Sequence, residues 1–300
     1  MKGNFKKYLF ILLSTSLCFS LLMLNQDLRN SVIYYDWLYL DGLLSRSIIE
    51  KEPSINVTKE SNLAFNYDWL INEGHIFIAH RGGNYLETGQ NTKSTIQNSI
   101  DSGLKFIEVD FYIDKERKIS CLTDKKFFFD ACSIEWLFSK ILEKKIYIVL
   151  DLKLNVHDKV SFAYFYSSLK KVKGFDKVKN NLIPQSYNLT NLNTLLELGY
   201  NLGPIFTSYR TNVPLSLLFN KLEEFQLKAM AIPYQSVDFI IGAGETDISF
   251  FLFPIKDKEQ LEVSLGSKVK GIYSPFEEFK DSFLGHSNSK QSNDNFRLGQ

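Results

Sequence analysis

The sequence has 300 residues, enough for one large domain or two modest ones, and 44% of them are hydrophobic, which allows a sizeable core. Its 35 Lys and Arg residues nearly balance 34 Asp and Glu residues, so the net charge is +1. Proteins that follow a nucleic-acid backbone usually carry a clear basic excess, and we expect no nucleic-acid partner. Three cysteines exclude a disulfide scaffold, and no Cys/His cluster indicates structural zinc.

The first segment of the chain carries a membrane-targeting pattern. Residues 8–24 form an almost unbroken apolar run behind Lys2, Lys6 and Lys7. A helix of this length spans roughly 26 Å, close to the ~30 Å of a hydrocarbon core. No small-residue cleavage site follows, which favours an uncleaved signal anchor over a cleaved signal peptide or a buried soluble helix. The basic flank predicts an export orientation, with the body of the protein extracytoplasmic and single-pass anchored, or secreted if the signal is cleaved.

The rest of the chain divides by composition. We expect the anchor or signal peptide at residues 1–26, a stalk or linker at 27–70, a folded domain at 71–284 and a disordered tail at 285–300. Cys121 and Cys132 lie close together in sequence. They either pair after export or remain two separate buried thiols.

The folded domain alternates strand and helix patterns. Strands are predicted at residues 75–79, 106–112, 147–152, 182–185, 205–208, 228–233, 250–254 and 271–273, and helices at 92–102, 134–143, 160–171, 189–198 and 215–225. Eight strands, most followed by a helix, predict an α/β fold of the (β/α)8 TIM-barrel type behind the N-terminal membrane-anchor helix. A doubly wound open sheet is the alternative, which is weakened because no glycine-rich GxGxxG motif follows a strand.

Acidic side chains occur near the ends of two predicted strands. Glu108 and Asp110 alternate with Ile107 and Val109, which places both carboxylates on one face of the strand. Asp151 lies at the end of the next strand. Three inward carboxylates would repel one another in an apolar barrel unless they surround a divalent cation, and oxygen ligands favour Ca²⁺ or Mg²⁺.

Basic and titratable side chains occur at the same strand ends. His80 and Arg81 follow the first strand and offer a proton-transfer group beside a fixed cation. Lys153 shares a face with Asp151. Arg81 and Lys153 are therefore candidates to hold an anionic substrate beside the metal. The alternative is that all these charges form salt bridges with one another inside the barrel.

These residues resemble those of a known family. The motifs that carry the resemblance are His80-Arg81-Gly82, Asn91-Thr92 at a helix start, Glu108-Val-Asp110, Asp151-Leu-Lys153, Pro184-Gln185-Ser186-Tyr187 and Gly271-Ile-Tyr273-Ser274. In this order they resemble the glycerophosphodiester phosphodiesterases, which belong to the phospholipase-C-like phosphodiesterase barrels. The resemblance implies metal-dependent hydrolysis of a glycerophosphodiester or related lipid head group.

The resemblance also implies roles for individual residues. His80 corresponds to a catalytic acid/base, and Arg81 to a catalytic phosphate contact. Lys153 corresponds to a phosphate-binding lysine. The metal ligands are implied to be Glu108, Asp110 and Asp151. From their places at strand ends, Tyr187 and Tyr209 are further candidates to donate a hydrogen bond to the substrate phosphate.

The chain departs from the family pattern at two positions. Thr123 stands where the family typically has a second catalytic His, and losing such a proton-transfer group commonly costs about 10²–10⁴ in rate. Gln90 stands where many members have Glu. His157 follows the third strand and is a candidate substitute, although a solvated loop histidine is the simpler interpretation. A catalytically impaired barrel that binds a phosphodiester or phosphorylated glycan is therefore the alternative function.

Overall fold

The structure, a computed structural model, describes residues 65–114, 116–153, 159–207, 222–223, 225–242, 246–267 and 269–285. The chain divides into two compact units, residues 1–58 and 59–300, and every described residue lies in the second unit. The apolar run at 8–24, most of the predicted helix at 215–225 and the tail from residue 286 lie outside the described residues. Within the described part, no helix is long and apolar enough to cross a membrane.

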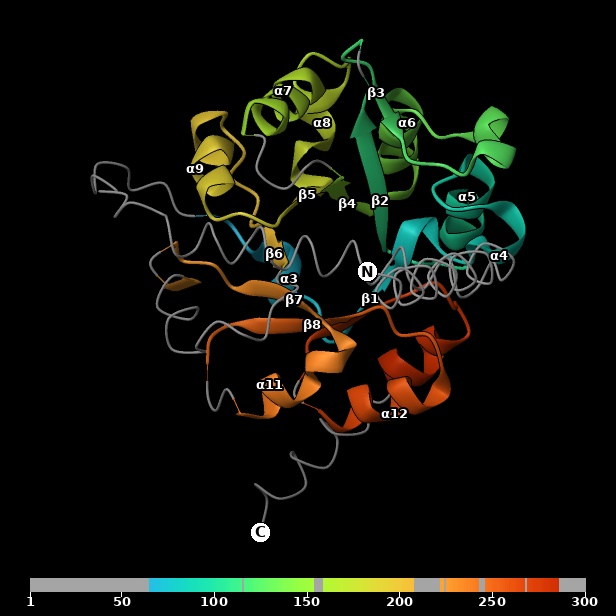
Figure 1. Cartoon of the computed structure of the whole chain (residues 1–300), viewed down its shortest axis with the longest axis vertical. Coiled ribbons are helices and arrows are strands. Elements are labelled where there is room, and N and C mark those ends of the chain that lie inside the picture. Colours follow the sequence, from blue (N-terminus) through green and yellow to red (C-terminus); the bar gives the residue numbers. More distant parts are fainter. Residues whose placement is uncertain are drawn as a thin grey trace, which may run out of the picture. The chain divides into compact units, whose positions relative to one another are not determined.

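A closed barrel of parallel strands forms the centre of the second unit (Figure 1). Its strands are β1 (Ile76–Ala79), β2 (Phe106–Ile113), β4 (Tyr147–Leu152), β5 (Leu182–Ser186), β6 (Ile205–Thr207), β7 (Ala229–Pro233), β8 (Ser249–Phe253) and β9 (Gly271–Ser274). The sheet closes because β1 pairs with both β9 and β2. Closure confirms the predicted barrel and excludes the open-sheet alternative. A further strand, β3 (Ile119–Cys121), runs antiparallel to β2 and extends it into a hairpin.

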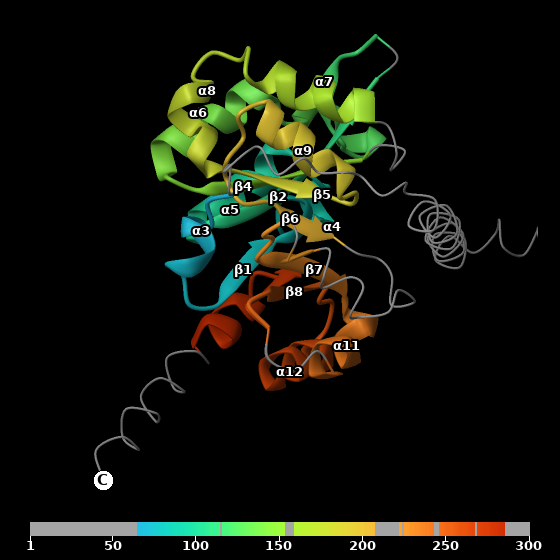
Figure 2. The same cartoon turned by 90° about the vertical axis from the view of Figure 1, so that its left-hand side faces the viewer.

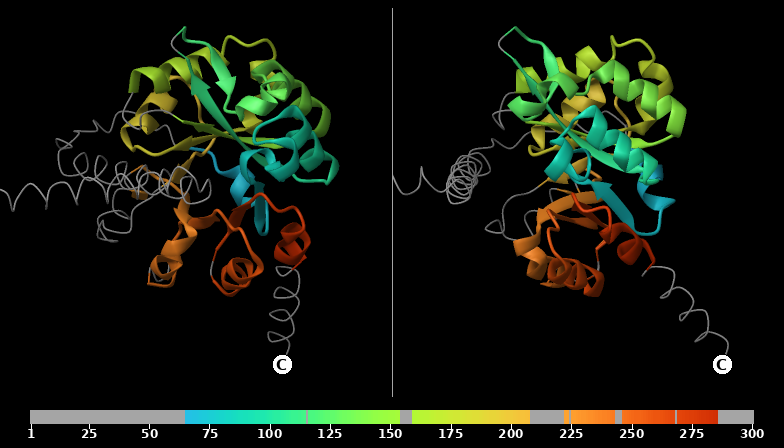
Figure 3. Two further views of the ribbon diagram at one scale, coloured as in Figure 1. Left: turned by 45° about the vertical axis from the view of Figure 1, so that its right-hand side comes forward. Right: turned by 90° about the vertical axis from the view of Figure 1, so that its right-hand side faces the viewer.

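Helices cover the outside of the barrel, as Figures 2 and 3 show from three directions. They are α3 (Asp68–Ile71), α4 (Tyr85–Thr88), α5 (Lys93–Asp101), α6 (Ile134–Lys144), α7 (Lys159–Leu169), α8 (Phe175–Val178), α9 (Thr190–Glu197), α11 (Val237–Gly242) and α12 (Lys258–Gly266). Four of these, α5, α6, α7 and α9, match predicted helices. The sequence did not predict α12, because it buries only Leu261 and Ser264 and so lacks a clear apolar face.

Two aromatic residues close the amino-terminal end of the barrel. The Trp69 ring lies 6.1 Å from the rings of both Phe106 and Phe251, on strands across the barrel, and its Nε1 donates a hydrogen bond to Gly203 O at 3.0 Å. Tyr67 is 3% exposed, and its hydroxyl donates to Pro204 O at 3.1 Å. The packed part of the chain therefore begins before residue 71, where we expected the barrel domain to start.

The barrel strands bury few polar side chains. The buried polar side chains of these strands are Glu108, Asp110, Asp151, Gln185, Ser186, Thr207 and Ser274. Most lie toward the carboxyl end of their strand, which in a closed parallel barrel is one common mouth. Chemistry-bearing side chains are thus concentrated at one end of an apolar scaffold.

Candidate active site

Three buried carboxylates lie together at this mouth. Asp110 and Asp151 are paired neighbours in the register of β2 and β4, and Glu108 lies two residues earlier on β2, on the same face. One oxygen from each carboxylate lies within 4.8 Å of the others. Asp151 Oδ1 is buried and accepts no hydrogen bond among the described residues. Hard oxygen ligands with an unused buried lone pair fit a divalent cation such as Ca²⁺ or Mg²⁺.

Two obligate cations lie beside the three acids. Lys153 Nζ forms ion pairs with Asp151 and, at 3.2 Å, with Asp110 Oδ1. Arg81 Nε lies 3.4 Å from Asp110 Oδ2. The salt bridges that we considered as an alternative are therefore present, and they engage Asp110 and Asp151.

Glu108 is the carboxylate whose ionised form is disfavoured by its surroundings. Its Oε2 accepts a hydrogen bond from the Arg81 backbone N–H at 2.9 Å. Burial, followed by the neighbouring charge of Asp110, raises the pKa of the Glu108 carboxyl well above its ordinary value. A bound cation would favour the ionised form and remove this penalty.

His80 faces Glu108, with Nε2 3.6 Å from Glu108 Oε2. Burial lowers the pKa of the His80 imidazole well below its ordinary value, and the positive charges of Arg81, Lys153 and Lys256 lower it further. The imidazole is therefore neutral near pH 7 and able to accept a proton. Lys256 follows β8, and our sequence analysis did not select it. The available sequence signal for Lys256 was its position just beyond a predicted strand, which is also the position of Lys153.

A sharp turn presents His80 and Arg81 to the carboxylates. The turn is η1 (His80–Gly82), in which Arg81 has φ 54° and ψ 39°, a left-handed conformation that costs a non-glycine residue roughly 1–2 kcal/mol. The following Gly83 has φ 120°, and a Cβ there would lie 2.0 Å from Ser99 Oγ. The turn thus depends on glycine and on the hydrogen bond between Arg81 N–H and Glu108.

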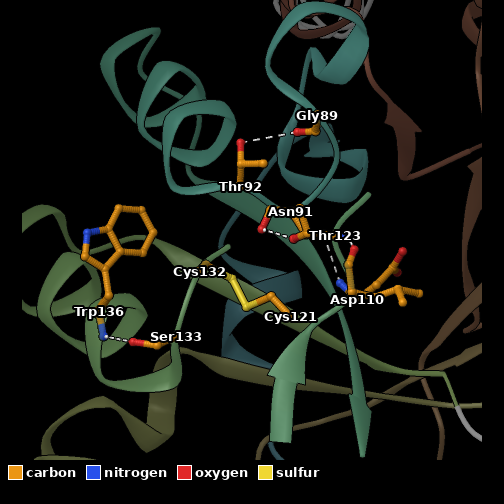
Figure 4. Close-up of a disulfide and its surroundings, with 10 residues drawn as sticks. Gly89, Asn91, Thr92, Asp110, Cys121, Thr123, Cys132, Ser133 and Trp136 are labelled. Atoms are coloured by element: carbon orange, nitrogen blue, oxygen red, sulfur yellow. Dashed lines mark hydrogen bonds between the residues drawn. A yellow bond between two sulfur atoms is a disulfide. The ribbon is translucent and has the colours of Figure 1, made fainter. Parts of the chain in front are cut away.

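Asn91 joins this turn to the β2–β3 hairpin. Its side chain donates to Leu122 O at 2.8 Å and accepts from Asp110 N–H at 3.1 Å (Figure 4). Its carbonyl accepts from Thr123 Oγ1 at 3.2 Å, and its own N–H donates to Arg81 O at 2.9 Å. Asn91 is fully buried with φ 54°. The sequence analysis had used it only as part of a motif.

Asp151 is held from a neighbouring strand. Tyr187 OH donates to Asp151 Oδ2 at 2.6 Å and accepts from Gln185 Nε2 at 3.0 Å. Tyr273 OH in turn donates to Gln185 Oε1 at 3.0 Å. Tyr187 was a candidate to donate a hydrogen bond to the substrate phosphate, whereas in the structure its hydroxyl donates to Asp151. The spacing of Gln185 and Tyr187, two residues apart at a strand end, was the available signal.

The remaining predicted residues lie at the rim or beyond the described chain. Tyr209 and His157 are outside the described residues. Thr123 lies just after β3, as predicted, and its hydroxyl donates a hydrogen bond to Asn91 O. Gln90 accepts from Arg81 Nη1 at 3.1 Å and donates to Asp124 Oδ1 at 3.0 Å, so it links the site to the hairpin end.

The barrel is similar in structure to solved phosphodiesterases, although its sequence is not closely similar to theirs. No family model matches the sequence, and no curated protein matches it significantly. A glycerophosphodiester phosphodiesterase from Parabacteroides distasonis is similar, with a TM-score of 0.57 and 15% identity, over 72% of this chain and 99% of that one. An Oleispira antarctica phosphodiesterase in complex with the product sn-glycerol-3-phosphate has a TM-score of 0.56 and 13% identity, over 69% and 96%. The Thermotoga maritima glycerophosphodiester phosphodiesterase has a TM-score of 0.51 and 18% identity, over 70% and 98%.

The chain has the glycerophosphodiester phosphodiesterase barrel fold. This confirms, at the level of fold, the resemblance noted from the motifs. The structure also brings together the predicted residues His80, Arg81, Glu108, Asp110, Asp151 and Lys153.

Proposed function

We propose that this barrel is a phosphoric diester hydrolase that acts on a glycerophosphodiester or related lipid head group with the aid of a bound Ca²⁺ or Mg²⁺. The observation that carries the proposal is the convergence of three buried carboxylates, a neutral histidine and two cations at one mouth of a phosphodiesterase-type barrel. The Oleispira structure with sn-glycerol-3-phosphate supports a small phosphodiester as substrate.

Each group has a role that its position supports. Glu108, Asp110 and Asp151 would hold the cation, which when bound supplies a positive charge that polarises a phosphoryl oxygen. Arg81 and Lys153 would bind the remaining phosphate oxygens and stabilise the charge that builds up on them. Neutral His80 would take the proton of the attacking group. Tyr187 keeps Asp151 oriented through its hydrogen bond.

Thr123 supports a second candidate function. Its hydroxyl does not titrate near neutral pH, so it cannot protonate a leaving alkoxide, and Asn91 O already accepts its proton. A barrel with the anion and metal sites but no second acid would bind a phosphodiester or phosphorylated glycan without efficient turnover.

Phosphorus NMR of the full chain distinguishes the two functions. A panel of glycerophosphodiesters with different head-group alcohols is followed with Ca²⁺, with Mg²⁺ and with a chelator. Hydrolysis that needs a cation and is lost in Asp151→Asn supports the enzyme, with exposed Asp176→Asn as the matched control variant. Ligand-induced shifts without hydrolysis of any substrate would support the binding function instead.

We also propose that the barrel is exported and held at a membrane by residues 8–24. The apolar run with its basic flank supports this location. The disulfide between Cys121 and Cys132 supports it independently, because disulfides persist mainly in oxidising compartments. Protease added outside intact cells should digest the barrel, and protection of the barrel would contradict export.

A further inference from the structure

A short turn beyond β3 exposes two adjacent aromatic rings. This turn, η2 (Lys125–Asp130), carries Phe128 and Phe129 with 66% and 84% of their surface exposed. They are the only exposed phenylalanines among the described residues. Lys125 and Lys126 precede them and are exposed as well. We name residues 125–129 the aromatic turn.

The aromatic turn is fixed to the barrel at several points. Phe127 packs against Gly89, where an added Cβ would lie 2.1 Å from the Phe127 ring. Asp130 Oδ2 accepts a hydrogen bond from the Ser94 N–H at 3.0 Å. The Cys121–Cys132 disulfide closes the segment at its base (Figure 4). Phe127 therefore anchors the turn, and the next two rings are presented to the surroundings by a braced backbone.

The aromatic turn also lies at the rim of the candidate active site. Asp124, the residue that precedes it, accepts a hydrogen bond from Gln90, which itself accepts one from Arg81. Arg81 is ion-paired with Asp110 among the three carboxylates. A surface that engages the aromatic turn would therefore lie beside the mouth of the barrel.

We propose that the aromatic turn inserts into the headgroup region of an anionic phospholipid bilayer. Aromatic side chains next to lysines match this interface, where the rings enter the acyl boundary and the ammonium groups meet lipid phosphates. A protein partner fits less well, because stable protein interfaces bury about 1,600 Å² in total, far more than two rings supply. The proposal concerns docking only and does not depend on the proposed hydrolysis.

Insertion of the aromatic turn is tested by fluorescence at a single labelled position in the full chain. A local probe is needed because the apolar run at 8–24 would by itself hold the protein on vesicles. In a Cys18→Ser background that leaves the disulfide intact, Phe129→Cys is labelled with a polarity-sensitive dye. The protein is reconstituted into vesicles of phosphatidylglycerol and phosphatidylcholine. Leu142→Cys, a 51% exposed position on α6, is the matched control. We expect a blue shift and quenching by spin-labelled lipid at position 129, and a water-like signal at position 142.

The lysines are tested by charge reversal. Lys125→Glu with Lys126→Glu should reduce lipid quenching at position 129 at least several-fold, whereas the exposed pair Lys171→Glu with Lys173→Glu should not. Quenching at position 129 that equals position 142 would overturn the proposal. A blue shift without lipid quenching would also overturn it, since the turn would then contact protein. Equal quenching in purely zwitterionic vesicles would overturn the assignment to an anionic surface.

Discussion

At the scale of single residues, Asn91 shows how a buried amide positions a charged site. Its side chain donates to the carbonyl of Leu122, which directly follows β3, and accepts from the N–H of Asp110 on β2. Asp110 is itself a candidate metal ligand, and Leu122 directly precedes Thr123 at the rim of the site. A change at Asn91 should therefore affect stability and site geometry together.

Asn91→Ala should lower the free energy of unfolding by about 2–4 kcal/mol, because it leaves a buried donor and a buried acceptor without partners. Alanine also tolerates the observed φ of 54° less well than asparagine. Denaturant unfolding measures the change. Asn98→Ala, at an exposed position of α5, should stay within about 0.5 kcal/mol of the native chain. Equal effects of the two variants would contradict the structural role of Asn91.

Thr123→His should raise hydrolysis of substrates with a poor alkoxide leaving group by at least about tenfold, because imidazole titrates near neutral pH. Substrates with an acidic phenol leaving group need no such proton and should gain little. Steady-state rates on both substrate types measure the effect. Thr123→Val is the control, since it also removes the hydrogen bond to Asn91 O without adding an acid. Equal rates for the two variants would mean that a missing proton donor does not limit this site.

At the scale of elements, a disulfide ties the end of the β2–β3 hairpin to the segment before α6. Cys121, the last residue of β3, is bonded to Cys132, which precedes α6, and the two are 11 residues apart. The sequence left open whether these two cysteines pair or remain separate thiols, and in the structure they are paired. Closing a loop of this length is expected to stabilise the fold by about 3 kcal/mol through the unfolded chain.

Replacing both Cys121 and Cys132 with Ala should therefore lower the free energy of unfolding by about 2–3 kcal/mol. Unfolding of the native chain with a reductant should shift by a similar amount. The double variant should not respond to the reductant, which serves as the internal control. A reductant shift that persists in the double variant would assign the effect to something other than this disulfide.

The sequence predicted the strands well because a closed parallel barrel buries both faces of every strand and leaves continuous apolar runs. Polar residues along these runs singled out Glu108, Asp110 and Asp151, and the structure brings their carboxylates together. Local patterns could not show which strand ends face one another, so the bond from Tyr187 to Asp151 was missed. Asn91 was missed as an organiser because its partners are 19 and 31 residues away in sequence.

At the scale of the whole molecule, barrel closure brings the residues of the candidate site together. Pairing of β2 with β4 places Asp110 beside Asp151, and pairing of β1 with β2 brings His80 to Glu108. The apolar interior below the mouth, closed by Trp69 at the far end, offers these charges little solvation. A cation bound by the three carboxylates would favour their ionised forms in this apolar setting.

Cation binding by the three carboxylates is tested most directly by thermal unfolding of the full chain with Ca²⁺, Mg²⁺ or a chelator. A cation at 100 times its dissociation constant should stabilise the native chain by about 2.7 kcal/mol, and Glu108→Gln should lose most of that increment. Glu143→Gln, an exposed substitution on α6, should keep it. Because burial and the charge of Asp110 raise the pKa of Glu108, protons compete with the cation for this carboxyl, and the increment should shrink as the pH falls. The same increment in Glu108→Gln as in the native chain would contradict the site.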